Sequence, residues 1–209
     1  MGIDRAGWPF ILGALVFAVV FGGWLGRAWS VPFLVLTAFF LFFFRDPERQ
    51  SPAGPTVVVS PADARIMAAG VWPWPGAPEG EWTTISMFLS PLDVHVNRTP
   101  VDGTVRRVEY HPGTFLPAYK KEAGELNEWT EVWFDRPGGP VVVRQIVGIL
   151  ARRIVCRLEA GQQVRAGDRF GVMKFGSRVD MFLPKTATIH VKPGDKVVGG
   201  ETLLATLAE

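Results

Sequence analysis

Two long apolar segments occupy the N-terminal part of this chain of 209 residues. Residues 6–25 carry no charge, and their number matches the ~20 apolar residues that a helix needs to cross a bilayer. A second apolar run, residues 28–44, follows after only Gly26 and Arg27. Because the connection is so short, the pattern predicts a helical hairpin that enters and leaves a membrane on the same side.

Beyond these segments the pattern changes to short runs of β-type residues broken by glycine and proline. Residues 47–55 form a polar linker bounded by prolines, and the folded domain is expected over residues 56–209. A short helix is expected near residues 116–126. The clearest predicted strands are residues 57–60, 82–89, 103–110, 130–134 and 141–147. The fold class is therefore a mainly β (α+β) soluble domain preceded by a transmembrane helical hairpin at residues 1–46.

The C-terminal third contains a weak internal repeat. Residues 164–171 (VRAGDRFG) and 191–199 (VKPGDKVVG) each lead from strand-like residues into a Gly-Asp turn. Lipoyl- and biotinyl-type domains share this pattern, which predicts a barrel-sandwich-like C-terminal part. Such domains carry a modified lysine that often follows a methionine, as Lys174 does here. A membrane-anchored carrier or adaptor using Lys174 is therefore an alternative function, although the residues flanking the Met-Lys pair differ from those usual in carriers.

Charge and composition exclude several classes of function. The formal net charge is only +2, and the chain has no dense basic stripe, so a nucleic-acid partner is not expected. The single cysteine, Cys156, excludes an internal disulfide. None of the three histidines is paired at metal-ligand spacing, so no metal site is expected.

Arginines flank the apolar segments unevenly. Arg5 precedes the first segment and Arg45, Arg49 and Arg65 follow the second, whereas Arg27 is alone between them. The positive-inside bias therefore predicts that both termini lie in the cytoplasm. The protein is expected in the cell (inner or plasma) membrane, with its folded domain on the cytoplasmic side.

The dipeptide Gly176-Ser177 is the strongest candidate for chemistry. A serine hydroxyl directly after a glycine carbonyl can attack that carbonyl and convert the amide into an ester, which β-elimination then opens. The new N-terminus would be a pyruvoyl group, an electron sink that forms Schiff bases with substrate amines. An isolated Gly-Ser pair is more often an ordinary turn between strands, so its meaning depends on the surrounding motifs.

Two further segments place polar residues among apolar ones. Asp63 lies in the sequence SPADA just after a predicted strand. Residues 88–100 read FLSPLDVHVNRTP, where strand alternation puts Asp93, His95 and Asn97 on one face. A histidine in that position is poised to act as a base near neutral pH, although a single histidine is more often structural.

Together these motifs resemble the phosphatidylserine decarboxylase family in its short prokaryotic form. The resemblance covers nearly the whole chain through FFRDP, SPAD, FLSPLDVHVNR, HPGTF and FGSR, which occur in that order. It implies a proenzyme that cleaves itself between Gly176 and Ser177 into a β chain of residues 1–176 and an α chain of residues 177–209. The two chains are expected to stay together as a heterodimer, alone or in a higher oligomer.

The resemblance also implies the reaction and its cofactor. A covalent pyruvoyl group derived from Ser177 would form a Schiff base with phosphatidylserine, a phospholipid of the bilayer, and yield phosphatidylethanolamine and CO₂. Diacyl and ether-linked lipids share this headgroup chemistry, so both remain candidate substrates. Matched by motif, Asp63 supports the base of self-cleavage, and His95 acts near the decarboxylating centre.

One position departs from the family pattern. Longer members have a second histidine where this chain has Arg98, so either His95 serves both steps or another group, such as His111, takes over. Arg178 and Lys174 flank the pyruvoyl position and are candidates for holding the substrate carboxylate or phosphate. Arg98 and His111 are further candidates for substrate binding.

Overall fold

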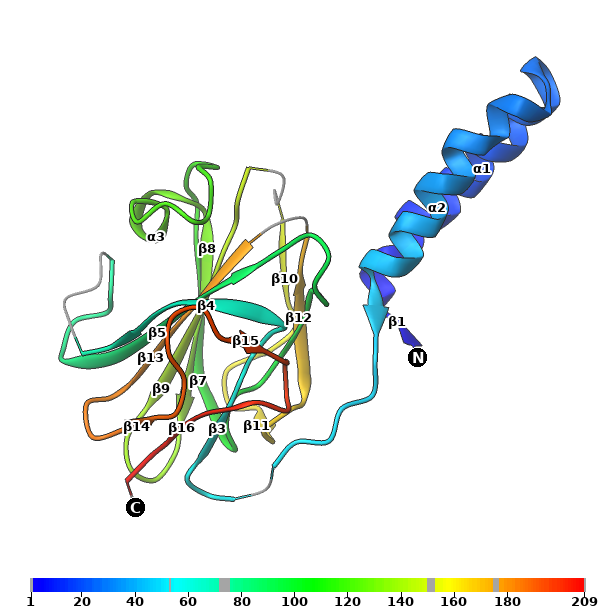
Figure 1. Ribbon diagram of the computed structural model, residues 1–209. Coiled ribbons are helices and arrows are strands. Elements are labelled where there is room, and N and C mark those ends of the chain that lie inside the picture. The colour runs from blue at the N-terminus through cyan, green and yellow to red at the C-terminus, as the bar shows by residue number, and fades with distance from the viewer. Residues whose placement is uncertain (1, 53, 72–75, 150–152, 175–176, 209) are drawn as a thin grey trace. The chain divides into compact units, whose positions relative to one another are not determined.

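The computed structural model describes residues 2–52, 54–71, 76–149, 153–174 and 177–208 (Figure 1). The chain divides into two compact units, Met1–Glu48 and Arg49–Glu209. Each unit has its own secondary structure, the first helical and the second built mainly from strands.

Apolar helices make up most of the first unit. Helix α1 spans Trp8–Leu25 and α2 spans Val31–Phe43, and a proline in the first turn of each suits the start of a helix. The two helices lie side by side (Figure 1) and pack through aromatic rings, such as Phe17 and Phe33 with centroids 5.7 Å apart. The remaining elements are 3₁₀ helices Arg5–Gly7 and Arg27–Ser30 and the paired strands β1 (Gly2–Ile3) and β2 (Arg45–Asp46).

One helix in the described part of the chain is long and apolar enough to cross a membrane. It comprises Arg5–Leu25 and has a mean hydropathy of 2.0. The second apolar helix, Arg27–Phe43, is shorter. An apolar N-terminal helix is therefore confirmed, whereas a hairpin that crosses the membrane twice stays a prediction.

Strands dominate the second unit, as the predicted mainly β class requires. The largest sheet has eight strands in the order β11-β7-β8-β9-β13-β5-β4-β15, and two three-stranded sheets have the orders β10-β12-β6 and β14-β16-β3. All of their strand contacts are antiparallel. The bounds are β3 Val57–Val59, β4 Ala64–Gly70, β5 Trp82–Leu89, β6 Val96–Arg98, β7 Gly103–His111, β8 Trp129–Asp135, β9 Val141–Ile146, β10 Ile154–Cys156, β11 Gln163–Val164, β12 Arg169–Met173, β13 Ser177–Pro184, β14 Thr188–Ile189, β15 Lys196–Val197 and β16 Leu203–Thr206.

The five strands expected most clearly from the sequence correspond to β3, β5, β7, β8 and β9, with ends that differ by at most one residue. The short helix expected near residues 116–126 is α3, Ala123–Leu126. Runs of β-branched and aromatic residues between glycines and prolines were sufficient to locate these elements.

The C-terminal third does not stand apart from the rest of the domain. Strand β12 pairs with β6, β15 with β4, and β16 with β3, while β13 lies between β9 and β5. A separate barrel-sandwich part is therefore not confirmed. The internal repeat itself is real at the local level, because Asp168 accepts a hydrogen bond from the amide of Arg165 (2.8 Å) and Asp195 accepts one from Lys192 (2.9 Å).

Strand β13 separates two different environments. Val179, Met181 and Leu183 belong to the main apolar core and are fully buried. Because side chains alternate along a strand, Ser177 shares the core face with them, whereas Arg178 and Asp180 lie on the opposite face. This alternation decides what surrounds each candidate residue near the predicted cleavage site.

Candidate functional site

Ser177 is the first residue of β13, in register with Leu89 of β5. The residue is fully buried, and its hydroxyl makes no hydrogen bond with any other described residue. Burying a polar group without a partner is unfavourable, so such a group in a native protein calls for an explanation. A reactive hydroxyl is one such explanation. Gly176, the other half of the predicted cleavage site, lies outside the described residues.

Residues before and after the predicted cleavage site contact β5 and the segment that follows it. On one side, the amide of Met173 donates to the carbonyl of His95 at 3.2 Å. On the other side, Ser177 pairs with Leu89. The structure thus brings His95 next to the strand that leads into residues 174–176.

His95 itself is fully buried, and its Nδ1 lies 2.9 Å from the carbonyl oxygen of Asp93. An imidazole Nδ1 facing a carbonyl oxygen carries the proton, so this contact favours the tautomer in which Nε2 is the basic atom. Orientation by such a contact is what a general base requires.

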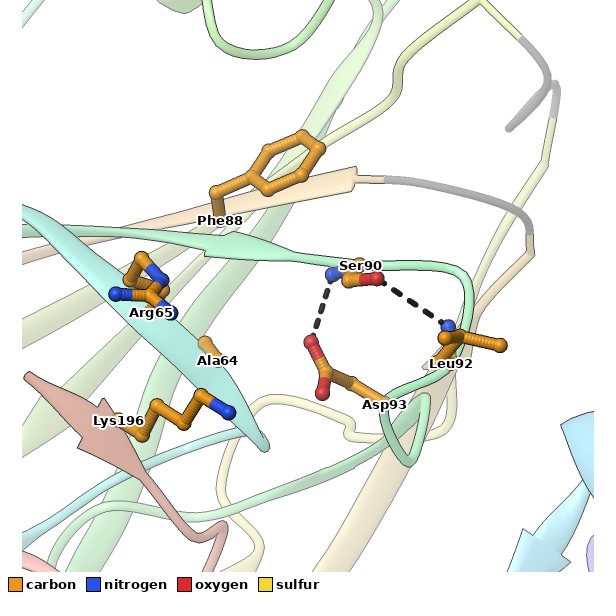
Figure 2. Close-up of a pocket in the computed structure, with 7 residues that line it drawn as sticks. All are labelled: Ala64, Arg65, Phe88, Ser90, Leu92, Asp93 and Lys196. Carbon is orange, nitrogen blue, oxygen red and sulfur yellow. Dashed lines mark hydrogen bonds between the residues drawn. The ribbon is translucent and has the colours of Figure 1, made fainter. Parts of the chain in front are cut away.

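The expectation that Asp93, His95 and Asn97 share a strand face is wrong, because only Asn97 lies in a strand. Strand β6 begins at Val96, so the alternation does not extend back to His95 or Asp93. Instead, the Asp93 carboxylate caps the turn before it by accepting a hydrogen bond from the amide of Ser90 at 2.7 Å (Figure 2). This role is structural and is typical of Asp in turns.

Asn97 lies in a polar contact that the sequence did not indicate. Its Oδ1 accepts a hydrogen bond from Nε2 of Gln145 at 2.6 Å, and both side chains are fully buried. Gln145 is in register with Val179 on β13, so it shares the core face with Ser177. A glutamine in the middle of the apolar run 141–147 is the signal that points to a buried polar group at this place.

Asp63 is held by residues from distant parts of the chain. Its carboxylate forms an ion pair with Arg49 (3.0 Å) and accepts a hydrogen bond from the amide of Gly199 at 2.8 Å. Strand β5 lies between β4, which begins just after Asp63, and β13, which begins at Ser177. Two strand spacings amount to roughly 10 Å, so the structure does not bring Asp63 and Ser177 into direct contact.

Arg178 lies on the face of β13 opposite Ser177. It is fully buried, its Nε donates to Asp180 at 2.7 Å, and its Nη1 donates to the carbonyl of Lys120 at 3.1 Å. A guanidinium that is already bound to a carboxylate and covered by a loop is not open to a substrate. This arrangement gives Arg178 a structural role.

The other candidates are dispersed. Arg98 is buried and donates to the carbonyl of Gly167 at 2.9 Å. His111 stacks on Trp129, with centroids 3.6 Å apart, at the end of β7, three strands away from β13 in the sheet. Lys174 is half-buried after the end of β12. The structure therefore places Arg98 and His111 on strands that do not pair with β13, whereas Lys174 precedes Ser177 by three residues.

A second buried ion pair escaped the sequence analysis. Arg144 of β9 donates through Nε to Glu131 of β8 at 2.9 Å, and each side chain is 4% exposed. Glu131 also accepts a hydrogen bond from the indole of Trp133 at 2.6 Å. From the sequence, charged residues at alternate strand positions are expected to face solvent. In the structure, the loop that contains α3 covers the sheet face of Glu131 and Arg144, and Arg144 donates a hydrogen bond to the carbonyl of Gly124 in that loop at 3.4 Å.

Neither Cys156 nor a cluster of metal-binding side chains adds a candidate site within the described residues. Burial raises the pKa of the Cys156 thiol, which keeps it protonated and unreactive at neutral pH. Within the described ranges, no group of three or more His, Cys, Asp and Glu side chains is arranged to hold a metal ion.

Comparison with known proteins gives a consistent result. The model of the family described as phosphatidylserine decarboxylase matches residues 36–205. Three proteins named phosphatidylserine decarboxylase proenzyme are similar over most of their length. They come from Nitrosomonas europaea (43% identical, covering 97% of this chain and 94% of the relative), Chlorobaculum tepidum (46%, covering 88% and 83%) and Paramagnetospirillum magneticum (43%, covering 98% and 87%).

Proposed function

Since this chain belongs to the phosphatidylserine decarboxylase family and is a decarboxylase, we propose that it acts on phosphatidylserine through a pyruvoyl group made from its own Ser177. The observation that carries the proposal is the buried Ser177 hydroxyl, which makes no hydrogen bond within the described residues. A proenzyme, the word in the names of the relatives, is a precursor that must be processed. The Gly176-Ser177 bond is the site that we assign to this processing.

Self-cleavage needs no reagent beyond the chain and one water. The Ser177 oxygen attacks the Gly176 carbonyl carbon, and the amide nitrogen leaves, which gives an ester. Loss of the Ser177 α-proton then expels the Gly176 carboxylate as the new end of the β chain. Water finally displaces the nitrogen of residue 177 as ammonia and leaves the ketone of the pyruvoyl group. Carbon, nitrogen and oxygen are all accounted for, and no oxidant is required.

His95 is the residue that we assign to proton transfer. It is fully buried, it contacts the strand that leads to the cleavage site, and its Nδ1 is oriented by the Asp93 carbonyl. A base is needed to remove the Ser177 hydroxyl proton during maturation, and a donor is needed to protonate the product carbon in each turnover. The pyruvoyl group supplies the electron sink for the loss of CO₂.

The contacts of Asp63 support a second role for this residue. Its carboxylate binds the amide of Gly199 from the proposed α chain and Arg49 from the proposed β chain. Arg49 also reaches Glu201 of the α chain at 3.3 Å. Together with the pairing of β15 with β4 and of β16 with β3, these contacts hold residues 177–209 in place after cleavage.

The apolar helices fit an enzyme whose substrate stays in the bilayer. We assign α1 and α2 to the membrane and the second unit to its cytoplasmic side. The long apolar segment of α1 and the arginines that flank the helices support this orientation. A diacyl lipid rarely leaves the bilayer, because exposing its two acyl chains to water is strongly unfavourable. Anchoring the enzyme in the membrane therefore brings the active site to its substrate.

Replacement of Ser177 tests this function directly. Ser177→Ala removes the nucleophile, so the purified protein should remain a single chain and should release no CO₂ from phosphatidylserine. Ser86→Ala is the matched control, because Ser86 is also fully buried, also makes no hydrogen bond within the described residues, and lies on the neighbouring strand β5. Full decarboxylase activity in Ser177→Ala would overturn the proposal.

The carrier alternative makes an opposite prediction. If Lys174 carried a covalently bound group, Lys174→Arg would abolish function while the chain stayed whole. The family relationship favours the decarboxylase, for which Lys174→Arg should still be cleaved and active. Gel electrophoresis under denaturing conditions and a CO₂-release assay distinguish the two.

A further inference from the structure

A cavity of about 410 Å³ opens beside the end of β5 (Figure 2). Its volume falls within the range that is typical of small-ligand sites. The lining residues come from β4, β5, β15 and the turn after β5, and they are Ala64, Arg65, Phe88, Ser90, Leu92, Asp93 and Lys196. Apart from Asp93, whose backbone carbonyl orients His95, none of them has been given a role in the chemistry assigned above.

Two cations line this cavity from adjacent strands. Arg65 and Lys196 are in register as partners of β4 and β15, and both residues are exposed. Arg65 donates to the carbonyl of Gly194 at 3.0 Å, and neither cation forms an ion pair with a carboxylate in the described parts of the chain. The carboxylate in the lining, that of Asp93, is turned to the amide of Ser90 (Figure 2). The cavity therefore has an excess of positive charge and suits an anion.

The cavity lies close to the proposed reactive centre. Leu89, the register partner of Ser177, stands between Phe88 and Ser90, which both line the cavity. Paired Cα atoms of antiparallel strands lie about 4.5–5.5 Å apart, and consecutive Cα atoms about 3.8 Å, so the Cα atoms of Phe88 and Ser90 are within roughly 9 Å of the Ser177 Cα. Arg65 and Lys196 start two and three strands away from β13, on the sheet face opposite the Ser177 side chain, and approach the start of β13 only through their long side chains. In the mature chain proposed above, that Cα becomes the ketone carbon.

An apolar rim adjoins the cations. Leu92 is 68% exposed, and Phe88 makes an edge contact with the ring of Tyr119, which is itself 61% exposed. Exposed large apolar residues beside a charged cavity match a ligand that is anionic at one end and apolar at the other. A glycerophospholipid has this chemistry.

We propose that Arg65 and Lys196 bind the phosphodiester of the lipid substrate, and that Phe88 and Leu92 contact the glycerol and the first acyl carbons. The inference rests on the proposed function, since it takes residue 177 as the point where the substrate amine binds. In a serine phosphodiester only one methylene and one oxygen separate the amine-bearing carbon from phosphorus. A substrate bound at residue 177 must therefore hold its phosphate nearby, and the long side chains of Arg65 and Lys196 are the cations that we assign to it.

The test uses the full-length protein with Arg65→Gln and Lys196→Gln combined. Two lost charge-assisted contacts should lower kcat/KM by about 10- to 100-fold, mainly through a higher KM. The substrate is a short-chain phosphatidylserine below its micelle concentration, so that each molecule is free in solution. The variant should still separate fully into two chains on a denaturing gel, because neither residue takes part in cleavage.

Charge-matched variants complete the design. Arg106→Gln combined with Lys185→Gln removes the same charge from exposed positions on β7 and beyond the far end of β13, and should leave kcat/KM unchanged. Arg65→Lys should keep most of the activity, because it retains the charge. Glycerophosphoserine should inhibit the wild-type enzyme competitively and inhibit the double variant less.

The possible outcomes distinguish a failure of the proposed phosphate site from a failure of the proposed decarboxylase function. A wild-type kcat/KM in the double variant would overturn the phosphate site while leaving the decarboxylase intact. A defect that occurs only on anionic vesicles, and not with monomeric substrate, would also overturn it, because the cations would then attract the membrane surface. Lys196→Gln alone serves as a control for misfolding. This side chain is exposed and not needed for packing, so a lower kcat/KM in this variant reflects lost binding. A wild-type protein that is neither cleaved nor active would instead refute the proposed function itself.

Discussion

Three basic residues lie on one face of the eight-stranded sheet, the face opposite the Ser177 side chain, and they differ in burial and in ion pairing. Lys196, Arg65, Phe88 and Arg178 form a continuous row of register partners across β15, β4, β5 and β13. At one end of the row, Arg178 is fully buried and bound to Asp180. At the other end, Arg65 and Lys196 are exposed and form no ion pair within the described residues.

The difference shows how burial decides what a cation can do. A buried guanidinium must be neutralised, because desolvating an unpaired charge costs several kcal/mol. Once paired with a carboxylate, it stabilises the fold and is closed to ligands. An exposed cation beside a cavity keeps its charge available, and binding a phosphate there adds an interaction that the free protein lacks. The same residue type therefore has a structural role at one end of the row and a binding role at the other.

The largest effect is expected from breaking the buried pair. Asp180→Ala leaves Arg178 buried without its carboxylate and should lower the free energy of unfolding by about 3–5 kcal/mol. Urea denaturation monitored by tryptophan fluorescence measures this loss. The experiment uses the Ser177→Ala variant, which is expected to stay uncleaved, so that a single chain unfolds. The double replacement Arg178→Met and Asp180→Leu should recover most of it, because both charges are gone. A loss below about 1 kcal/mol in Asp180→Ala would mean that the pair behaves like a surface ion pair.

An intermediate effect is expected at Arg49, whose side chain is 15% exposed and contacts both Asp63 and Glu201. Arg49→Gln should lower stability by about 1–3 kcal/mol, the range for hydrogen bonds to charged groups. In the cleaved protein the α chain should dissociate at a lower urea concentration, which size-exclusion chromatography detects. Arg49→Lys should recover only part of the loss, because it lacks the planar fork of arginine. An unchanged dissociation midpoint in Arg49→Gln would remove Arg49 from the contacts that hold the chains together.

These expectations show which features a sequence reveals. Strand β5 was predicted with its correct bounds, because its residues alternate between a core and a second face over a short local run. The role of Arg178 was not predictable in the same way. Its position next to Ser177 suggested a shared site, whereas alternation along β13 puts the two side chains on opposite faces.

Long-range contacts explain the other features of the structure that the sequence did not predict. Gln145 of β9 and Asn97 of β6 belong to different sheets and are far apart in the sequence, so no local pattern encodes their contact. The same holds for the ion pair between Arg49 and Asp63, which joins the linker to the turn before β4. Motif order indicated candidate residues for the family reaction, but only the strand order shows that Arg98 and His111 lie in separate places.

A small effect on stability is expected at the other end of the row. Arg65→Gln and Lys196→Gln should each change the free energy of unfolding by no more than about 0.5 kcal/mol, as is usual for exposed residues. The reduced kcat/KM of the double variant would then reflect lost binding rather than a damaged fold. A marked loss of stability in Lys196→Gln would show that this cation is structural, like Arg178, and would remove the contrast between the two ends.

The smallest effect is expected at Lys185, which pairs with Glu81 on the surface with side chains 53% and 77% exposed. Ion pairs of this kind contribute little, because solvent screens them and side-chain entropy opposes them. Lys185→Gln should change neither the unfolding midpoint nor kcat/KM. Any decrease in kcat/KM comparable with that of the Arg65 and Lys196 variants would indicate a general response to net charge and would weaken the case for a specific phosphate site.

The central claim is that this chain becomes active by cutting itself before Ser177. The most direct measurement is the intact mass of the purified full-length protein under denaturing conditions, with terminal sequencing of each species. The account predicts two chains, residues 1–176 and 177–209, with the smaller one blocked to Edman degradation and lighter than a serine-headed chain by the change from serine to pyruvoyl. An active preparation that contains only the uncut chain, or a smaller chain that begins with a free serine, would contradict it.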